Sequence, residues 1–282
     1  MPRDFCHGLL VLAGCFLTCL ATTAMAQWPL HPTPEAPRTP DGQLDMDSPV
    51  VRLANEKPDF SGVWEFVRHG QRGEQGRPVG EPAQPPPGVA PYATFWELGY
   101  GLEDGLPYQP WARKLKAQRT ADESKNHPDA WCLPIGNVQF HTHLQPRQIV
   151  HHPDALVIHY EASAGTRLIF TDGRPLPDRN RLPFWYGYST GHWEGEELVV
   201  ESTNFRDGGW LDYNGSPLTD AARVIERFRR PTYGSMEIDI TVDDPKAYTE
   251  PFTVRVDHRL LPDDNLIEWV CENEQSTQYF DP

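Results

Sequence analysis

The chain has 282 residues, of which 40 are acidic and 25 are basic, and its formal net charge is -15 at pH 7. A chain this acidic lacks the basic stripe that phosphate contacts require, which excludes a nucleic-acid-binding module. The length suits one large β domain and is marginal for two.

The N-terminus has the features of a secretory signal peptide. Arg3 precedes an apolar run over residues 9–21, and residues 24–26 (AMA) supply the small side chains that signal peptidase requires. Residues 12–15 (LAGC) also match a lipobox, but too short an apolar region precedes them. We therefore expect a signal peptide over residues 1–26, cleavage near Ala26, and a periplasmic or secreted mature protein.

The cysteines agree with export. Cys6, Cys15 and Cys19 lie in the segment that cleavage removes, which leaves Cys132 and Cys271. An even pair in an oxidising compartment predicts one disulfide, which ties the turn before the barrel to the last expected strand. Two separate buried thiols are the alternative.

The mature chain is expected to begin with an irregular segment and then a strand. Residues 27–56 are rich in proline and polar residues and predict an extended leader. Residues 58–66 (PDFSGVWEF) predict the first strand. Gly62 and Trp64 form a Gly-x-Trp element that resembles the first strand of lipocalin-like barrels, although a tryptophan that only packs one end of a core explains it equally.

Two insertions follow the first strand. Residues 74–91 are rich in proline and glycine and predict an irregular loop. Residues 95–125 are expected to be a helical cover over the barrel, and residues 111–125 give the best helix in the chain, with Pro110 near its start. Neither insertion is expected to form a separate domain.

The rest of the chain alternates apolar and polar residues in short runs that turn signals separate. Period-two alternation places every second side chain on one face of a strand. No other run reaches the roughly 18 apolar residues of a membrane span. The pattern predicts a mainly β protein: residues 57–282 as a single antiparallel up-and-down β-barrel with an irregular and helical N-terminal elaboration. The expected strands are residues 148–152, 155–161, 166–172, 186–194, 197–205, 222–228, 235–242, 252–259 and 266–272.

Longer motifs resemble a protein family. They are TDGRPLP at residues 171–177 and the segments 186–205, 210–230 and 243–254. The chain resembles a widespread family of exported bacterial proteins of unassigned function, and the likeness covers most of the mature chain. It implies one compact β-rich domain and export but no reaction. Many similar sequences carry a histidine where this chain has Leu218.

Two residues are candidates for acid and base chemistry inside the barrel. Glu226 shares a strand face with Val224 and Phe228, and His258 shares one with Val256. The structural alternatives are a glutamate that pairs with arginine and a half-exposed histidine at the end of its strand.

Other residues are candidates for ligand binding. Glu201 is a further carboxylate that can face inward, and Arg174 or Arg227 can hold an anionic group. Solvated turn residues and core packing are the alternatives for these positions and for the aromatic set. That set, a possible platform for a sugar or an aromatic ligand, is Trp185, Tyr186, Tyr188, Trp193 and Trp210.

Histidines cluster where the barrel is expected to begin. If His141 and His143 lie on a strand they face the same way, and His152 or His192 can complete a metal site. A sheet with several surface histidines explains the pattern as well. We expect no metal and no cofactor.

The chain contains no nucleophile elbow, phosphate-binding glycine loop or dinucleotide fingerprint. The first hypothesis is an exported monomeric barrel that binds a small apolar or aromatic molecule. The second is a cofactor-free periplasmic lyase, isomerase or hydrolase that uses Glu226 and His258, with Arg174 or Arg227 holding an anionic group. The third is an envelope structural or interaction module.

Overall fold

A computed structural model of the chain describes residues 32–178, 182–269 and 271. The expected signal peptide, its cleavage near Ala26 and the lipobox fall outside these residues and stay predictions. No helix within the described residues is both long and apolar enough to cross a membrane.

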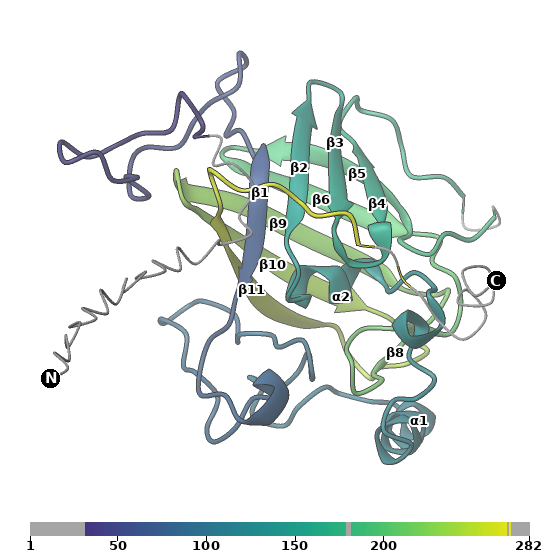
Figure 1. The fold of residues 1–282 in the computed structure, drawn as a ribbon. Coiled ribbons are helices and arrows are strands. Elements are labelled where there is room, and N and C mark those ends of the chain that lie inside the picture. Colours follow the sequence, from purple (N-terminus) through teal and green to yellow (C-terminus); the bar gives the residue numbers. More distant parts are fainter. Residues whose placement is uncertain (1–31, 179–181, 270, 272–282) are drawn as a thin grey trace, which may run out of the picture. The chain divides into compact units, whose positions relative to one another are not determined.

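Nine strands of the described chain close into one barrel, in the order β1-β11-β10-β9-β6-β5-β4-β3-β2 (Figure 1). The predicted mainly β barrel is therefore confirmed. The barrel strands are β1 (Gly62–Val67), β2 (Arg147–His152), β3 (Ala155–Tyr160), β4 (Thr166–Phe170), β5 (Tyr188–Glu194), β6 (Glu197–Thr203), β9 (Arg223–Thr232), β10 (Ser235–Asp243) and β11 (Phe252–Leu260).

The alternation of the sequence determines which side chains fill the barrel. In β9 and β10 every second residue is buried, as the period of a strand requires. Ile238 and Ile240 of β10 and Val254 and Val256 of β11 are all 0% exposed. These side chains form most of the core on this side of the barrel.

One pairing differs from the expected antiparallel order. Among the strand pairs of the described chain, β4 and β5 alone are parallel, with Ile169 opposite Ser189. The residues between the two strands, 171–187, include Pro175, Pro177 and Pro183, and β5 begins beside the last residues of β4 and runs in the same direction. Between β6 and β9 in sequence, β7 (Gly209–Trp210) and β8 (Pro217–Leu218) form a separate small hairpin. β6 and β9 are neighbours in the barrel.

Gly187 ends this connection in a conformation that only glycine adopts easily. Its φ is +70°, and a Cβ there would lie 2.6 Å from the ring of Phe205. We expect Gly187→Ala to lower the free energy of unfolding by about 2 to 3 kcal/mol, measured by urea denaturation. Gly195→Ala is the control, because φ there is +62° and nothing lies within 4 Å, so only the backbone cost of about 1 kcal/mol applies. Equal losses in the two variants would contradict the role of the Phe205 contact.

The helical elements are α1 (Pro110–Ala121), α2 (Asn137–Thr142) and the 3-10 helices η1 (Glu74–Gly76), η2 (Pro128–Trp131) and η3 (Ala162–Ala164). All residues of α2 are buried, and this helix lies at the end of the barrel where β2 begins (Figure 1). The expected helical cover over residues 95–125 is helical only within α1. Residues 95–109 are irregular because Gly99, Gly101, Gly105 and Pro107 interrupt them.

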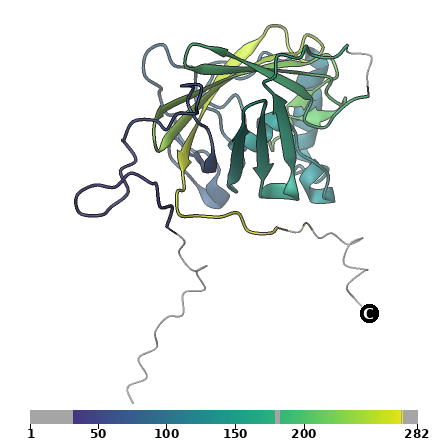
Figure 2. The same cartoon turned by 90° about the horizontal axis from the view of Figure 1, so that it is seen from above.

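Both ends of the described chain pack against the barrel. Residues 32–56 are irregular. The turn between β9 and β10 holds this leader, because the backbone N–H groups of Tyr233 and Gly234 in the turn donate to backbone oxygens of the leader. The expected strand over residues 266–272 is wrong in its described part. Because β1 pairs with β11, the barrel is already closed, and residues 261–269 cross the outer face of β1 to β3 instead (Figures 1 and 2).

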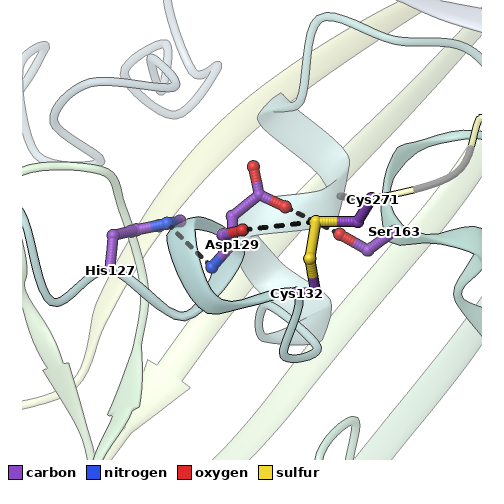
Figure 3. The surroundings of a disulfide bond; sticks show 5 residues. All are labelled: His127, Asp129, Cys132, Ser163 and Cys271. Carbon is purple, nitrogen blue, oxygen red and sulfur yellow. Dashed lines mark hydrogen bonds between the residues drawn. A yellow bond between two sulfur atoms is a disulfide. The ribbon is translucent and has the colours of Figure 1, made fainter. Parts of the chain in front are cut away.

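The predicted disulfide is confirmed. Cys132 and Cys271 are bonded across a sequence separation of 139 residues, with their Cα atoms 5.5 Å apart (Figure 3). Beside them, Ser163 donates to the carboxylate of Asp129 at 2.8 Å. The bond attaches the C-terminal segment to the residue that follows η2.

Candidate functional site

The barrel interior contains a group of charged side chains within the apolar core. Glu226 on β9 is 0% exposed, and Arg167 on β4 and His141 on α2 are each 1% exposed. Glu226 faces inward because it alternates with Val224 and Phe228, both of which are buried. The side chain of His141 reaches it from the helix that closes the barrel end.

These three side chains form one hydrogen-bonded network. The Nη1 and Nη2 atoms of Arg167 donate to the two carboxylate oxygens of Glu226, with Nη1 to Oε1 at 2.8 Å. The Nε2 atom of His141 lies 2.6 Å from the same Oε1. A two-point contact between arginine and a carboxylate is strong and directional, so it fixes the position of Glu226.

Two serines complete the surroundings of Arg167. Ser189 and Ser202 lie opposite each other on β5 and β6, and their hydroxyl oxygens are 2.8 Å apart. Nη2 of Arg167 donates to Ser202 at 3.0 Å and to Ser189 at 3.1 Å, and Nε donates to Ser189 at 3.3 Å. Each nitrogen of this buried guanidinium therefore has an acceptor.

The network sets the protonation states of its members. Burial alone raises the pKa of Glu226, but the charge and hydrogen bonds of Arg167 and the hydrogen bond from His141 outweigh it and lower the pKa to about 2. Burial lowers the pKa of His141 by more than Glu226 raises it. At neutral pH the carboxylate is ionised, and His141 is neutral and donates through Nε2.

A second buried arginine lies beside this network. On β2, Arg147 donates through Nη1 to the backbone oxygen of His141 at 3.0 Å and through Nη2 to those of His143 at 2.9 Å and Gln145 at 3.3 Å. Nη1 also lies 2.5 Å from Nε2 of His258 on β11. Arg147 thus satisfies carbonyl groups at the C-terminal end of α2.

His258 is neutral in this position. Burial and the neighbouring charge of Arg147 lower the pKa of His258 well below its ordinary value. Nε2 lies 2.5 Å from Nη1 of Arg147 and 3.0 Å from the backbone oxygen of His141. Because a guanidinium can only donate, we assign Nε2 as the acceptor and place the proton of the neutral ring on Nδ1.

Several buried polar atoms of the site have no hydrogen-bond partner among the described residues. They are Nδ1 of His141, Nδ1 of His258 and Nε of Arg147, and the hydroxyl of Tyr160 joins them with only a loose interaction with Arg167. Tyr160 is 2% exposed and lies directly opposite Arg147 in the pairing of β2 with β3. Buried polar groups in folded proteins are nearly always paired, so this concentration requires an explanation.

The structure places both predicted acid and base candidates in the barrel interior. Glu226 is paired with Arg167, as its structural alternative described, and His258 is 1% exposed rather than half-exposed. The two do not contact each other directly. His141 bonds Glu226 through its ring, and its backbone oxygen lies 3.0 Å from His258. Their catalytic roles stay predictions.

Two predicted ligand-binding residues lie on the outside of the barrel. Val200 and Ser202 of β6 point into the barrel, so Glu201 between them points outward, where it pairs with Arg223 at 2.6 Å. Arg227 alternates with Glu226 and therefore faces outward, where it pairs with glutamates of the β5–β6 hairpin. The expectation that Glu201 faces inward is wrong, and Arg227 cannot hold an anion inside the barrel.

The third predicted cation, Arg174, lies in an exposed turn. Its Nε is 2.9 Å from a carboxylate oxygen of Asp172, and its guanidinium lies 3.6 Å from the ring centroid of Phe170. It makes no contact with the buried network in the described chain.

The five predicted aromatic residues do not form one platform. Trp185 and Tyr186 precede β5, Tyr188 and Trp193 lie on β5, and Trp210 lies on β7. Each ring packs against a different partner, so the described residues form no shared ligand surface. Their partners are Arg206 for Trp185, Phe140 for Tyr186, Phe170 for Tyr188, Phe60 for Trp193 and Arg119 for Trp210.

The possible histidine metal site is not formed. His141 is the penultimate residue of α2 and His143 follows that helix, so the strand geometry that aligns residues i and i+2 does not apply. His141 is buried, whereas the ring of His143 packs edge-on against Phe95. Within residues 32–178, 182–269 and 271, no group of three or more histidine, cysteine or acidic side chains could hold a metal ion.

The sequence interpretation missed Arg167 and Arg147 and gave His141 a different role. The sequence contained one signal for Arg167. It is two residues from Ile169 on β4, so both side chains point to the same face, and Ile169 is fully buried. However, Leu168 in the opposite phase is also apolar and is 43% exposed. Both faces of β4 therefore looked apolar, and the inward face was not evident.

No model of a known protein family matches the chain, and no curated protein matches it. The evidence for function is therefore the barrel and its buried network.

Proposed function

We propose that the chain is an exported barrel that binds a small apolar or aromatic molecule, whose polar group contacts the buried network. The supporting observation is the group of unpaired polar atoms around Arg147, Tyr160 and the two histidines. A network that served stability alone would gain from pairing these atoms, because each unpaired buried group costs about 1 to 3 kcal/mol.

The rings beside the network suit an apolar or aromatic body. Phe228 lies 5.8 Å from the ring of His141, and Phe66 lies 6.2 Å from that of His258. Tyr160 stacks on Phe140 of α2 at 4.0 Å. Binding sites for small molecules combine such surfaces with a few polar groups that fix orientation.

Entry of a ligand requires movement, because the residues of the network are no more than 2% exposed. The short helix α2, of 6 residues, carries His141 and closes this end of the barrel. We propose that displacement of α2 opens the interior. Such a motion would occur on the microsecond to millisecond scale that is usual for closing elements.

The test uses residues 27–282 exported to an oxidising compartment. Native mass spectrometry detects a retained molecule, and calorimetry measures the binding of phenol, benzoate, benzamide and their naphthalene counterparts. We expect one bound equivalent. Tyr160→Phe should weaken the best hydrogen-bonding probe by roughly three- to tenfold while leaving the free energy of unfolding within about 0.5 kcal/mol of wild type.

Tyr248→Phe is the matched control. The Tyr248 hydroxyl donates to the backbone oxygen of Pro217 at 2.7 Å, in a contact with the β7–β8 hairpin. We expect this variant to lose about 1 kcal/mol of stability and to keep its affinity for the probe. The proposal would be rejected if native mass spectrometry showed the protein without any bound molecule and calorimetry detected no binding of any probe.

A second candidate function, a cofactor-free enzyme, has one specific observation in its favour. Glu226 accepts from Nε2 of His141, so Nδ1 of this neutral ring is an unprotonated and unpaired base. In this candidate His141 moves the proton and Glu226 orients the ring. The distinguishing result is conversion of a bound probe to product by the wild type but not by His141→Gln, with binding retained in both.

A further inference from the structure

The charges inside the barrel do not balance. Arg167 has a carboxylate partner, Glu226, in a two-point contact. Arg147 is equally buried at 1% exposure, but its partners in the described chain are three backbone oxygens and the neutral ring of His258. The interior of the described barrel therefore holds two guanidinium groups and one carboxylate at this site.

No neighbouring residue of the described chain supplies the missing negative charge. Tyr160 is the group whose charge would act on Arg147, but burial raises the pKa of its hydroxyl, so it is neutral. Glu226 is already engaged with Arg167 and His141. An ion that is buried without a counter-charge is strongly unfavourable, even where hydrogen bonds to carbonyl groups offset part of the cost.

We infer that the ligand of the barrel is an anion, a small carboxylate on an apolar or aromatic body, and that Arg147 is its counter-charge. This inference rests on the proposed function and specifies the class of ligand. A carboxylate has several lone pairs and binds best where more than one donor is directed at it.

The unpaired donors lie on side chains that adjoin Arg147. Its own Nε has no partner among the described residues. The hydroxyl of Tyr160, which lies opposite Arg147 across the β2–β3 pair, interacts with Arg167 but makes no well-formed hydrogen bond within the described chain. Nδ1 of His258 is a third unpaired donor, on a ring whose Nε2 lies 2.5 Å from Arg147. The side chains come from β2, β3 and β11, and β1 separates β11 from β2 in the barrel.

A purely structural role for Arg147 explains only part of this arrangement. Two of its nitrogens, Nη1 and Nη2, satisfy carbonyl groups at the end of α2. A neutral donor such as an amide could serve those carbonyls without burying a charge, and the capping role leaves Nε without a function. An experiment can separate capping of α2 from anion binding. If Arg147 only caps the helix, the protein should bind a carboxylate and the corresponding amide equally well.

The experiment compares matched probes on the exported chain. Calorimetry at fixed ionic strength measures benzoate against benzamide, and the naphthalene carboxylate against its carboxamide. We expect each carboxylate to bind at least tenfold more tightly than its amide, roughly the value of one charge-assisted hydrogen bond. In Arg147→Gln this preference should disappear, whereas Arg227→Gln, on the outside of the barrel, should keep it.

A measurement on the wild type alone covers the case in which Arg147→Gln fails to fold. The thermal midpoint should rise with the carboxylate and stay unchanged with the amide at the same concentration. Amides that bind wild type as tightly as carboxylates would overturn the anion inference and leave the binding barrel intact. The absence of binding by either member of both pairs would instead overturn the proposed function.

Discussion

Replacing Glu226 with glutamine is expected to lower the free energy of unfolding at pH 7 by about 3 to 5 kcal/mol. The substitution preserves size but removes the charge that Arg167 contacts at 2.8 Å and through a second, shorter contact. Arg167 is 1% exposed, so its guanidinium cannot recover solvation by moving to the surface. The loss is that of an uncompensated buried cation rather than that of one hydrogen bond. Urea denaturation followed by circular dichroism measures it.

Glu201→Gln provides the control on an adjacent strand. Glu201 of β6 pairs with Arg223 at 2.6 Å on the outer face, where the two side chains are 30% and 42% exposed. An ion pair with this exposure contributes about 0 to 1 kcal/mol, because water and salt screen it. Losses of similar size in the two variants would contradict the buried character of the Arg167 contact.

The same pair predicts a dependence on pH. The pKa of Glu226 is about 2 in the folded protein, below its ordinary value of 4.5. A carboxylate with a lowered folded pKa stabilises the fold above its unfolded pKa and loses that contribution as the pH falls through the folded one. We therefore expect the difference in stability between wild type and Glu226→Gln to be constant from pH 7 to about pH 5 and to shrink between about pH 4.5 and pH 2. A difference that grows with acidification would contradict this assignment.

The sequence predicted the inward position of Glu226 correctly because β9 alternates cleanly. Val224, Glu226 and Phe228 are all 0% exposed, and the intervening Ile225 and Arg227 are not buried. Arg167, the partner of Glu226, is 59 residues away in sequence. Period-two patterning determines the face of one strand but not which strand lies across the barrel, so the partner could not be derived from it.

The barrel itself followed from the same alternation, whereas three features of the fold did not. The parallel pairing of β4 with β5 depends on the direction in which the chain enters β5, which no local signal encodes. The last expected strand has suitable residues, but β1 already occupies the free edge of β11. The position of α2 is also a tertiary property, because its six residues are too few to give a helical period.

Replacing Cys132 and Cys271 with serine is expected to lower the free energy of unfolding by about 5 kcal/mol. The reason lies mainly in the unfolded chain, where the bond closes a loop across 139 residues and removes conformations that the open chain regains. The loop contains every barrel strand except β1, so the constraint acts on most of the unfolded domain. Urea denaturation of the double variant at neutral pH measures the loss.

The folded barrel should be retained in this variant. Neither cysteine lies on a barrel strand, and the charged network contains no atom of either residue. Near-ultraviolet circular dichroism should therefore change little, and ligand affinity should match that of the wild type. A reducing agent should destabilise the wild type by a similar amount and leave the double variant unaffected. A loss below about 1 kcal/mol would show that residual structure in the unfolded chain already holds these segments together, because the entropy of loop closure would then contribute little.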